Sequence, residues 1–233
     1  MRIIRHIPNT ITSLNLLAGA LGVIYALEGR TDIAFPLMLA AAVFDFCDGL
    51  AARLLNAYSP IGKELDSLAD MVSFGLLPAL MLYRAMPDGP AAFLPLFIAV
   101  MSGLRLAKFN VDERQTLDFI GLPTPACAMV CGSLAYYIQR TPDSLLATWS
   151  ATSWFIPAVA ICLGLLLVSE IPMFGMKIKK GHSLADAKRI IFLVFAAAAI
   201  LFTVLIRANW SLAPLLIFAF YILENLVCAL FRR

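Results

Sequence analysis

The sequence predicts an all-α, polytopic integral membrane protein with about eight transmembrane helices and both termini on the cytoplasmic side. Of the 233 residues, 61% are hydrophobic and only 14% are charged, whereas soluble domains are about 45–50% apolar and about 25% charged. The mean hydropathy is +0.87, and apolar runs of roughly 20 residues, the length that spans a bilayer, alternate with polar breaks. A disordered chain, a coiled coil and a water-soluble domain are excluded. A net charge of +3 with dispersed basic residues gives no indication of nucleic acid as a partner.

Eight apolar runs are the candidate membrane helices, and turn-forming residues separate several of them. The runs lie near 11–28, 33–56, 61–83, 91–109, 122–139, 153–171, 189–206 and 211–231. The first run contains Thr12, Ser13 and Asn15 and no clear small-residue cleavage site, so it is predicted to be a retained helix. No fixed-period repeat divides the chain, which is predicted to form a single membrane-embedded domain over residues 1–233.

The distribution of basic residues sets the expected orientation in the cytoplasmic (inner) membrane. Those at the predicted outer ends are Arg30, Arg84, Arg140 and Arg207. The other 14 of the 18 would lie at cytoplasmic ends: Arg2, Arg5, Arg53, Lys63, Arg105, Lys108, Arg114, Lys177, Lys179, Lys180, Lys188, Arg189, Arg232 and Arg233. Because cytoplasmic loops are enriched in Lys and Arg, this asymmetry predicts cytoplasmic termini and agrees with eight spans.

Four aspartates in the second and third runs are the strongest functional signal: Asp45, Asp48, Asp66 and Asp70. Carboxylates within a membrane span are costly, and by default they mark function. Helical periodicity places Asp45 and Asp48 on one face of their run. Asp66 and Asp70 share a face of the next run, across a short turn. The four aspartates are therefore expected to converge in the cytoplasmic half of the bilayer.

This expected convergence indicates a metal site. Four anions in an apolar pocket repel one another unless a cation lies among them. Oxygen ligands without His or Cys favour a hard ion such as Mg²⁺, Mn²⁺ or Ca²⁺. The small residues Gly49, Ala52 and Gly62 would leave room for a bulky ligand. Arg53 and Ser59 would bind phosphate oxygens, an arrangement expected for phosphoryl-group chemistry.

Two other interpretations of the acids stay open. The carboxylates can pair with Arg53, Lys63 or Arg105 as a structural network, or they can relay protons in a cation-coupled transporter. A transporter would predict broken helices in corresponding halves of the chain. The acids instead lie within one block of 26 residues, 45–70, which favours an enzyme.

The block that holds the four aspartates has a specific spacing, D-x2-D-G-x2-A-R-x8-G-x3-D-x3-D. It resembles the signature of the CDP-alcohol phosphatidyltransferase family, membrane enzymes that make phospholipids. The resemblance implies that the four aspartates hold two divalent ions, Mg²⁺ or Mn²⁺, and that Asp70 is the general base for the acceptor hydroxyl. It also suggests a homodimer. The residues expected at the CDP moiety are Gly49, Ala52, Arg53, Ser59 and Gly62.

The start of the first run carries a second resemblance. Residues 8–15, followed by Gly19, resemble the segment that packs against the nucleotide in this family. This implies that Asn9, Thr12 and Asn15 contact CDP-diacylglycerol. Asn9 and Thr12 are also ordinary capping residue types, so a simple helix start explains them equally well.

Three looser matches concern the acceptor alcohol. Residues 105–110, 119–125 and 169–173 resemble the phosphatidylserine synthase branch of the family. This resemblance implies transfer of a phosphatidyl group from CDP-diacylglycerol to L-serine at an active site on the cytoplasmic side. The candidate serine-binding residues are Arg105, Lys108 and Asn110. Lys108 can equally be a membrane anchor.

A different acceptor stays open. Glycerol 3-phosphate or an inositol phosphate would need two or three cations around its dianion. Lys177, Lys179 and Lys180 could contribute to such a site, or they could meet anionic lipid headgroups.

Overall fold

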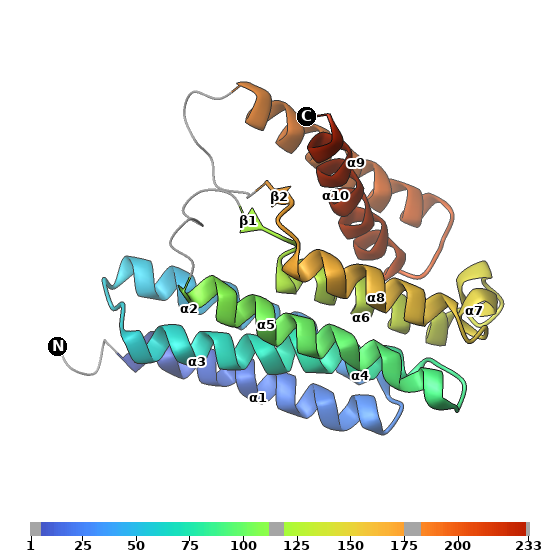
Figure 1. Ribbon diagram of the computed structural model, residues 1–233, viewed down its shortest axis with the longest axis horizontal. Coiled ribbons are helices and arrows are strands. Elements are labelled where there is room, and N and C mark those ends of the chain that lie inside the picture. The colour runs from blue at the N-terminus through green and yellow to red at the C-terminus, as the bar shows by residue number, and fades with distance from the viewer. Residues whose placement is uncertain (1–5, 112–118, 175–182, 232–233) are drawn as a thin grey trace.

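The computed structural model describes residues 6–111, 119–174 and 183–231, and this part of the chain is helical almost throughout (Figure 1). The elements in chain order are α1 (Ile7–Leu27), α2 (Thr31–Leu54), α3 (Pro60–Asp70), the π-helix η2 (Met71–Leu76), α4 (Leu77–Arg84), the 3-10 helix η3 (Pro90–Leu96), α5 (Phe97–Val111), β1 (Phe119–Ile120), α6 (Thr124–Arg140), α7 (Leu145–Ser150), α8 (Phe155–Val168), β2 (Pro172–Met173), α9 (Ser183–Leu205) and α10 (Leu212–Leu230). Each predicted run corresponds to one helix or to consecutive helices joined end to end.

Six helical segments of the described chain are long and apolar enough to cross a membrane. They are α1, α2, Pro60–Arg84, Pro90–Val111, Lys188–Leu205 and α10. The helices at the other two predicted spans are shorter, since α6 has 17 residues and α8 has 14. The predicted all-α polytopic membrane class is thus confirmed. The count of eight spans and the side on which the termini lie stay predictions.

α1 packs along α2 and also contacts α3, η2 and α4. Its buried residues are all small or polar: Pro8, Thr12, Asn15, Ala18, Gly19, Gly22 and Ala26. Small residues allow helix backbones to approach closely in a membrane. At Gly22, for example, an added Cβ would lie only 2.6 Å from Cδ2 of Leu77. α1 is therefore positioned by close backbone contact, and its buried polar groups lie directly against its neighbours.

The segment Pro60–Arg84 is one continuous row of helices with an irregular turn inside it. Ser59 caps its start, because the Ser59 Oγ accepts the backbone N–H of Gly62 at 3.0 Å and Pro60 follows in the first turn. Directly after Asp70 the helix widens into η2, and it then continues as α4. π-helical turns are rare and often occur at functional sites.

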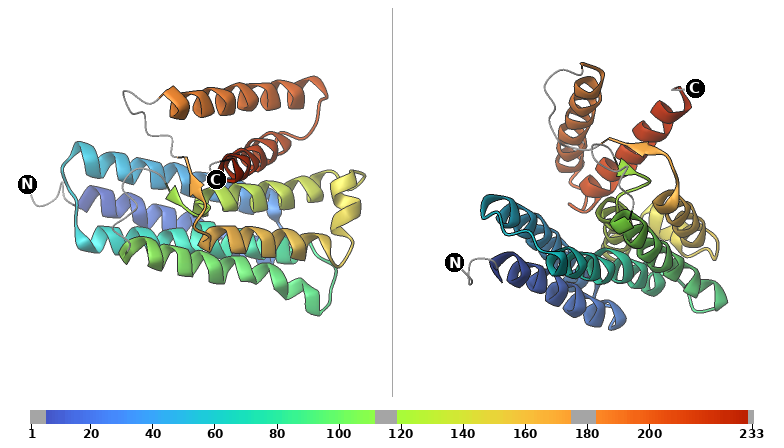
Figure 2. Two further views of the ribbon diagram at one scale, coloured as in Figure 1. Left: turned by 45° about the horizontal axis from the view of Figure 1, so that its top comes forward. Right: turned by 60° about the vertical axis from the view of Figure 1, so that its left-hand side comes forward.

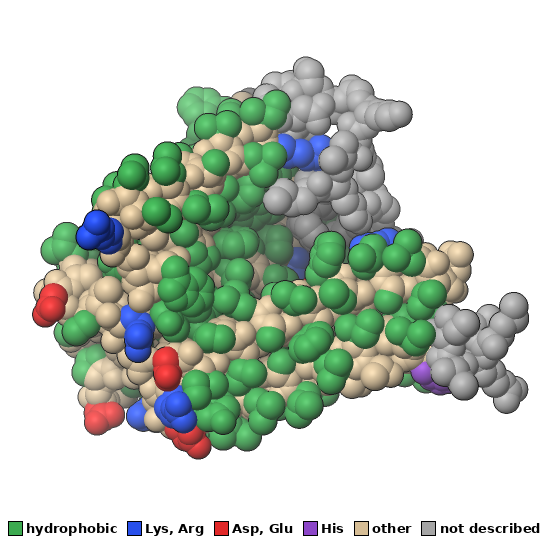
Figure 3. Space-filling view, turned by 180° about the vertical axis from the view of Figure 1, so that it is seen from behind, with side chains coloured by type: hydrophobic (Ala, Val, Ile, Leu, Met, Phe, Trp, Pro, Cys, Tyr) green, Lys and Arg blue, Asp and Glu red, His purple; other side chains and the backbone are tan. Residues whose placement is uncertain are grey.

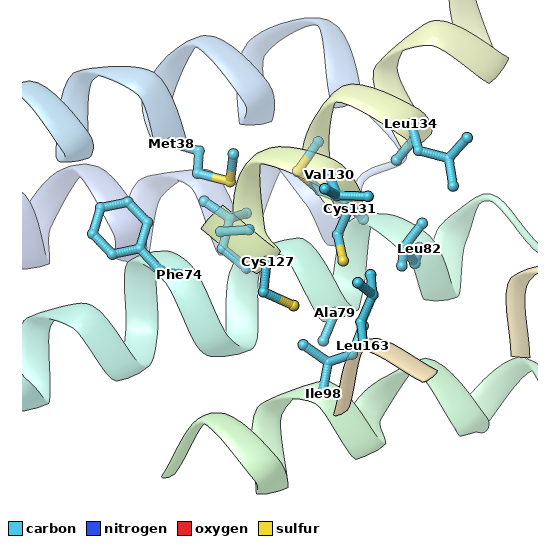
Figure 4. Packing of buried hydrophobic residues seen from close by; sticks show 14 of the residues in the cluster. Met38, Phe74, Ala79, Leu82, Ile98, Cys127, Val130, Cys131, Leu134 and Leu163 are labelled. Carbon is cyan, nitrogen blue, oxygen red and sulfur yellow. The ribbon is translucent and has the colours of Figure 1, made fainter. Parts of the chain in front are cut away.

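α6 lies in the middle of the packing, in contact with α2, α4 and α10. Cys127 and Cys131 on this helix lie among the side chains of Met38, Ile98 and Leu163 (Figure 4). Both cysteines are fully buried free thiols. They act as small apolar packing residues in this core.

Two short strands tie the start of α6 to the end of α8. β1 pairs antiparallel with β2, and Gly121, which follows β1, donates its N–H to the carbonyl of Ile171 at 2.9 Å. Gly121 has a φ of 78°, and a Cβ there would lie 2.6 Å from the carbonyl oxygen of Leu167. Only glycine fits both conditions. This connection fixes where α6 begins, beside the C-terminal half of α5.

α9 lies apart from the main bundle, and α10 connects it to the rest (Figure 2). α10 is held by Asn225, whose Oδ1 accepts the backbone N–H of Phe174 at 2.9 Å, and by the Tyr221 hydroxyl, which donates to the carbonyl of Phe174 at 3.0 Å. On the face seen in Figure 3, hydrophobic side chains cover the sides of the helices and acidic side chains gather at one end. This pattern suits helices surrounded by lipid.

Candidate active site

The end of the bundle where α1 begins brings the aspartates of α2 and α3 together. Asp45, Asp48 and Asp66 offer carboxylate oxygens that all lie within 4.8 Å of one another. Asp70 follows Asp66 by one helical turn, and it lines a cavity together with Asp45 and Asp66. All four acids therefore lie in a single site.

α1 packs against both aspartate-bearing helices and supplies polar groups to each. Thr12 is 3% exposed, its hydroxyl donates to the carbonyl of Pro8 at 3.0 Å, and it lies beside Asp48. Asn15 is fully buried, and its Nδ2 donates to Oδ1 of Asp70 at 3.4 Å. The N-terminal half of α1 is thus part of the acidic site and not only a membrane anchor.

The clustered carboxylates fit a hard divalent cation. Asp48 Oδ2 and Asp66 Oδ1 are buried, and neither has a hydrogen-bond partner within the described chain. The salt bridge found within the described chain is Arg30 with Asp32, at the other end of α2. Arg105 interacts electrostatically with Asp70, but no basic side chain of the described residues lies within salt-bridge distance of the four aspartates. The structural ion-pair interpretation is therefore supported only by this one interaction. Buried, unpaired carboxylate oxygens at this spacing are best stabilised by a cation among them.

Gly49, Ala52 and Arg53 follow the acids along α2. Arg53 is exposed, and its guanidinium turns back along the helix, with Nη1 3.8 Å from the position that a Cβ on Gly49 would take. Gly49 and Ala52 are half-buried. Because Gly49 has no side chain, the exposed Arg53 guanidinium lies next to the acids with open access, as phosphate binding requires.

Asn9, Ser59 and Gly62 meet at the N-terminal ends of α1 and α3. A Cβ on Gly62 would lie 2.9 Å from Oδ1 of Asn9 and 3.0 Å from Oγ of Ser59. Glycine at this position therefore lets the two helix ends approach each other. The Ser59 hydroxyl also caps α3. Three predicted nucleotide-binding residues from the starts of two helices therefore lie side by side.

A cavity of about 320 Å³ opens beside Asp70. Three of the four aspartates line it, and the other polar residues that line it are Lys63, Ser67, Arg105 and Asn110. Arg105 is 7% exposed, and its Nη1 donates to the Thr124 hydroxyl at 2.9 Å. Its Nε is buried and has no partner among the described residues. A fixed guanidinium with a free donor is suited to a carboxylate ligand.

Asn110 joins the end of α5 to α3. Its Nδ2 donates to the Ser67 hydroxyl at 2.9 Å, and its backbone carbonyl accepts from Nζ of Lys63 at 2.9 Å. Its Oδ1 is buried and unpaired within the described residues. Lys108, the third candidate for serine binding, is exposed in the last turn of α5 and does not line the cavity.

The sequence analysis missed Lys63 and Ser67 as polar lining residues of the cavity. Thr124 lies within the stretch 119–125 that it singled out, but the contact with Arg105 was not foreseen. Lys63 and Ser67 lie four residues apart on α3, on either side of Asp66, and this spacing is a signal that could have identified them. Nothing local to Thr124 points to Arg105, because the contact joins two helices.

A comparison with protein families identifies the class of this site. The family model described as CDP-alcohol phosphatidyltransferase matches residues 5–168, which include α1 to α8 and all four aspartates. The chain belongs to the CDP-alcohol phosphatidyltransferase family. The resemblance of the block 45–70 to this family is confirmed.

Two of three similar curated proteins carry the same name. The chain is 36% identical over 232 residues to the CDP-diacylglycerol–serine O-phosphatidyltransferase of Mycobacterium leprae, covering 94% of this chain and 72% of the relative. It is 34% identical over 139 residues to the protein of the same name from Bacillus subtilis, covering 56% and 76%. It is 31% identical over 175 residues to the archaetidylserine synthase of Methanothermobacter thermautotrophicus, covering 71% and 68%.

Proposed function

We propose that this member of the family transfers the phosphatidyl group of CDP-diacylglycerol to the hydroxyl of L-serine, giving phosphatidylserine and CMP. The observation that carries the proposal is the cavity that places Asp70 and Arg105 next to the aspartate cluster. A base beside a buried guanidinium suits an acceptor with both a hydroxyl and a carboxylate. The names of the relatives support the same acceptor.

The four aspartates would hold two divalent ions, Mg²⁺ or Mn²⁺. When bound, such ions polarise the diphosphate and offset the charge that develops on the departing CMP. Arg53, beside Gly49, would bind a phosphate oxygen of the donor. The residues proposed to bind CDP-diacylglycerol are Asn9, Thr12, Gly49, Ala52, Arg53, Ser59 and Gly62.

Asp70 would act as the general base. It accepts the proton of the serine hydroxyl while the serine oxygen forms a bond to the phosphorus of the phosphatidyl group. The bond from that phosphorus to the bridging oxygen of the diphosphate breaks, and CMP leaves with the bonding electrons. A hydroxyl is a weak nucleophile at neutral pH, so a base within hydrogen-bond reach is needed.

The unpaired polar atoms of the cavity are complementary to a zwitterion. The free Nε of Arg105 would donate to the serine carboxylate, and Oδ1 of Asn110 would accept from the ammonium group. A phosphorylated acceptor would need several converging cations. The cations among the described residues that line the cavity are Arg105 and Lys63, and one N–H of Lys63 donates to the carbonyl of Asn110. Lys177, Lys179 and Lys180 lie outside the described residues.

The active site would face the cytoplasm from the inner membrane, with the acyl chains of the donor in the bilayer and the cytidine head in water. The basic residues support this orientation. Those at predicted cytoplasmic ends within the described residues are Arg53, Lys63, Arg105, Lys108, Lys188 and Arg189. Arg2, Arg5, Arg114, Arg232 and Arg233 lie outside them. Both termini would be cytoplasmic, and the protein would act as a homodimer.

Release of CMP by the purified protein in liposomes tests the proposed function. With CDP-diacylglycerol and Mn²⁺ or Mg²⁺, we expect release only when L-serine is added, and none after chelation of the metal. Parallel reactions receive glycerol 3-phosphate, inositol 1-phosphate or no acceptor. Release with one of those phosphates and not with serine would overturn the acceptor assignment. No release with any acceptor, from folded protein, would overturn the proposed transfer altogether.

Replacement of Arg105 tests the acceptor site. We expect Arg105→Lys to raise the KM for serine by about tenfold and Arg105→Met by about 100-fold, because a hydrogen bond to a charged group contributes about 1.5–3 kcal/mol. The KM for CDP-diacylglycerol should not change. Arg140→Met, at the C-terminal end of α6, is the control and should leave both values unchanged. An unchanged KM for serine in Arg105→Met would show that Arg105 does not bind the acceptor.

A further inference from the structure

Asn15 of α1 joins the proposed base to the π-helix that follows it. The Asn15 side chain is fully buried. Its Nδ2 donates to Oδ1 of Asp70 at 3.4 Å, and its Oδ1 accepts from the Ser73 hydroxyl at 2.7 Å. The same hydroxyl lies 3.1 Å from the backbone carbonyl oxygen of Asn15. An amide that is bonded at both its oxygen and its nitrogen is held in one orientation.

The close approach of α1 to η2 creates this arrangement. Gly19, one turn after Asn15, faces Ser73, and a Cβ at position 19 would lie 2.2 Å from Oγ and 2.9 Å from Cα of Ser73. Glycine therefore leaves the space that Ser73 occupies. Because η2 begins directly after Asp70, the base and the serine that contacts α1 belong to consecutive turns of one helical segment. The irregular turn thus has a specific partner on α1.

The contact matters because of what surrounds Asp70. This carboxylate lines the acceptor cavity together with Asp45 and Asp66, and like charges drive a freely rotating carboxylate away from its neighbours. A neutral amide that donates to one carboxylate oxygen fixes the plane of the group without adding a charge. Oδ1 of Asp70 keeps a second lone pair for a metal ion, so the other oxygen is left for the acceptor hydroxyl.

The burial of Asn15 also bears on its other assigned role. The resemblance of residues 8–15 to the family implies that Asn15 contacts CDP-diacylglycerol. A side chain with no exposed surface, whose amide oxygen and nitrogen are both engaged, has little left to offer a nucleotide. Asn9, at the end of the same helix, is half-buried and lies beside Gly62 and Ser59. The two asparagines of α1 therefore have different surroundings.

We propose that Asn15 and Ser73 are positioning residues for Asp70. Ser73 orients the Asn15 amide, and Asn15 holds Oδ1 of Asp70 so that the other carboxylate oxygen faces the acceptor hydroxyl. This inference rests on the proposed phosphatidyl transfer, in which Asp70 is the base. It gives Asn15 a part in the chemical step, while Asn9 and Thr12 of the same helix keep their proposed part in donor binding.

Steady-state kinetics of CMP release test this inference. Asn15→Leu keeps the branched shape and the number of side-chain heavy atoms and removes both hydrogen bonds. We expect kcat to fall about 10- to 100-fold, the usual cost of losing a group that orients a catalytic residue. The KM values for serine and CDP-diacylglycerol should stay within about twofold of the wild type, since no substrate contact is lost. The shift in melting temperature on adding Mn²⁺ should also persist.

Two further variants separate positioning from general packing. Ser73→Ala should lower kcat in the same way but less, and the double variant with Asn15→Leu should be no slower than Asn15→Leu alone, because both act through one contact chain. Ser102→Ala is the matched control. Ser102 is a fully buried serine on α5 that packs against Gly75 of η2 and has no hydrogen-bond partner in the described chain. It should leave kcat unchanged.

Several results would overturn the inference while leaving the proposed function intact. A raised KM for CDP-diacylglycerol with normal kcat in Asn15→Leu would show that Asn15 binds the donor instead of positioning Asp70. Equal losses of kcat in Ser73→Ala and Ser102→Ala would show that the loss comes from disturbed packing of η2 and not from the hydrogen bond to Asn15. If Asn15→Leu does not fold, Ser73→Ala alone decides, and a normal kcat there refutes the proposal. Failure of the proposed function itself appears separately, as wild-type protein that releases no CMP with serine.

Discussion

Asp70→Asn is expected to lower kcat about 10²- to 10⁴-fold, the range that a general base contributes. The variant keeps the size of the side chain and an oxygen that can accept the hydrogen bond from Asn15. It loses the ability to take the proton of the acceptor hydroxyl. Binding of CDP-diacylglycerol should be largely retained, because the donor residues on α1 and α2 are unchanged. CMP release and donor binding, measured on the same preparation, test both parts of this prediction.

Asp88→Asn is the control for Asp70→Asn. Asp88 is an exposed carboxylate in the turn before η3, and it does not line the cavity. Its neutralisation should leave kcat and both KM values unchanged. If Asp70→Asn retained near-normal turnover, another group would be the base, and the proposed positioning role of Asn15 would also lose its purpose.

The helical class and the acidic site could be predicted because both depend on local spacing. Apolar runs of bilayer length predict helices without knowledge of their partners. In a helix, residues three or four positions apart share a face, so Asp45 pairs with Asp48 and Asp66 with Asp70 before any tertiary contact is known. The short turn around Ser59 then brings the two pairs to the same end of the bundle. A short block of sequence therefore contains most of the information about the metal site.

The acceptor cavity depends on distant contacts, and its details could not be predicted in the same way. Arg105 stood out because it is a costly charge within a span, but its partner Thr124 comes from another helix. Lys108, one turn further along α5, was a second candidate from the sequence, but it is exposed in the last turn of the helix and does not line the cavity. Hydrophobic periodicity also gives no sign of the wide turn η2, which follows Asp70 without a break in apolar character.

Asp48→Asn is expected to separate stability from function. The three clustered carboxylates repel one another, and Oδ2 of Asp48 is buried without a partner in the described chain. Removing one charge should therefore raise the apparent melting temperature of the metal-free protein by a few degrees, since like charges in a buried site destabilise the fold. The same change removes a metal ligand. Mn²⁺ or Mg²⁺ should then stabilise the variant much less than the wild type, and CMP release should fall at least about 100-fold.

Thermal unfolding in detergent, with chelator and with added Mn²⁺, measures both effects on one sample. Asp143→Asn, in the exposed turn after α6, removes an equal charge far from the cluster and should change neither value. A lower melting temperature for metal-free Asp48→Asn would mean that the carboxylate is already compensated, and the case for a cation among these acids would weaken. A higher melting temperature, together with loss of the shift on adding metal, would mean that a bound metal ion normally offsets the repulsion between these carboxylates. The repulsion among the four aspartates would then lower the stability of the metal-free protein. The same clustered charge would bind the metal ions, so stability is given up for function at this site.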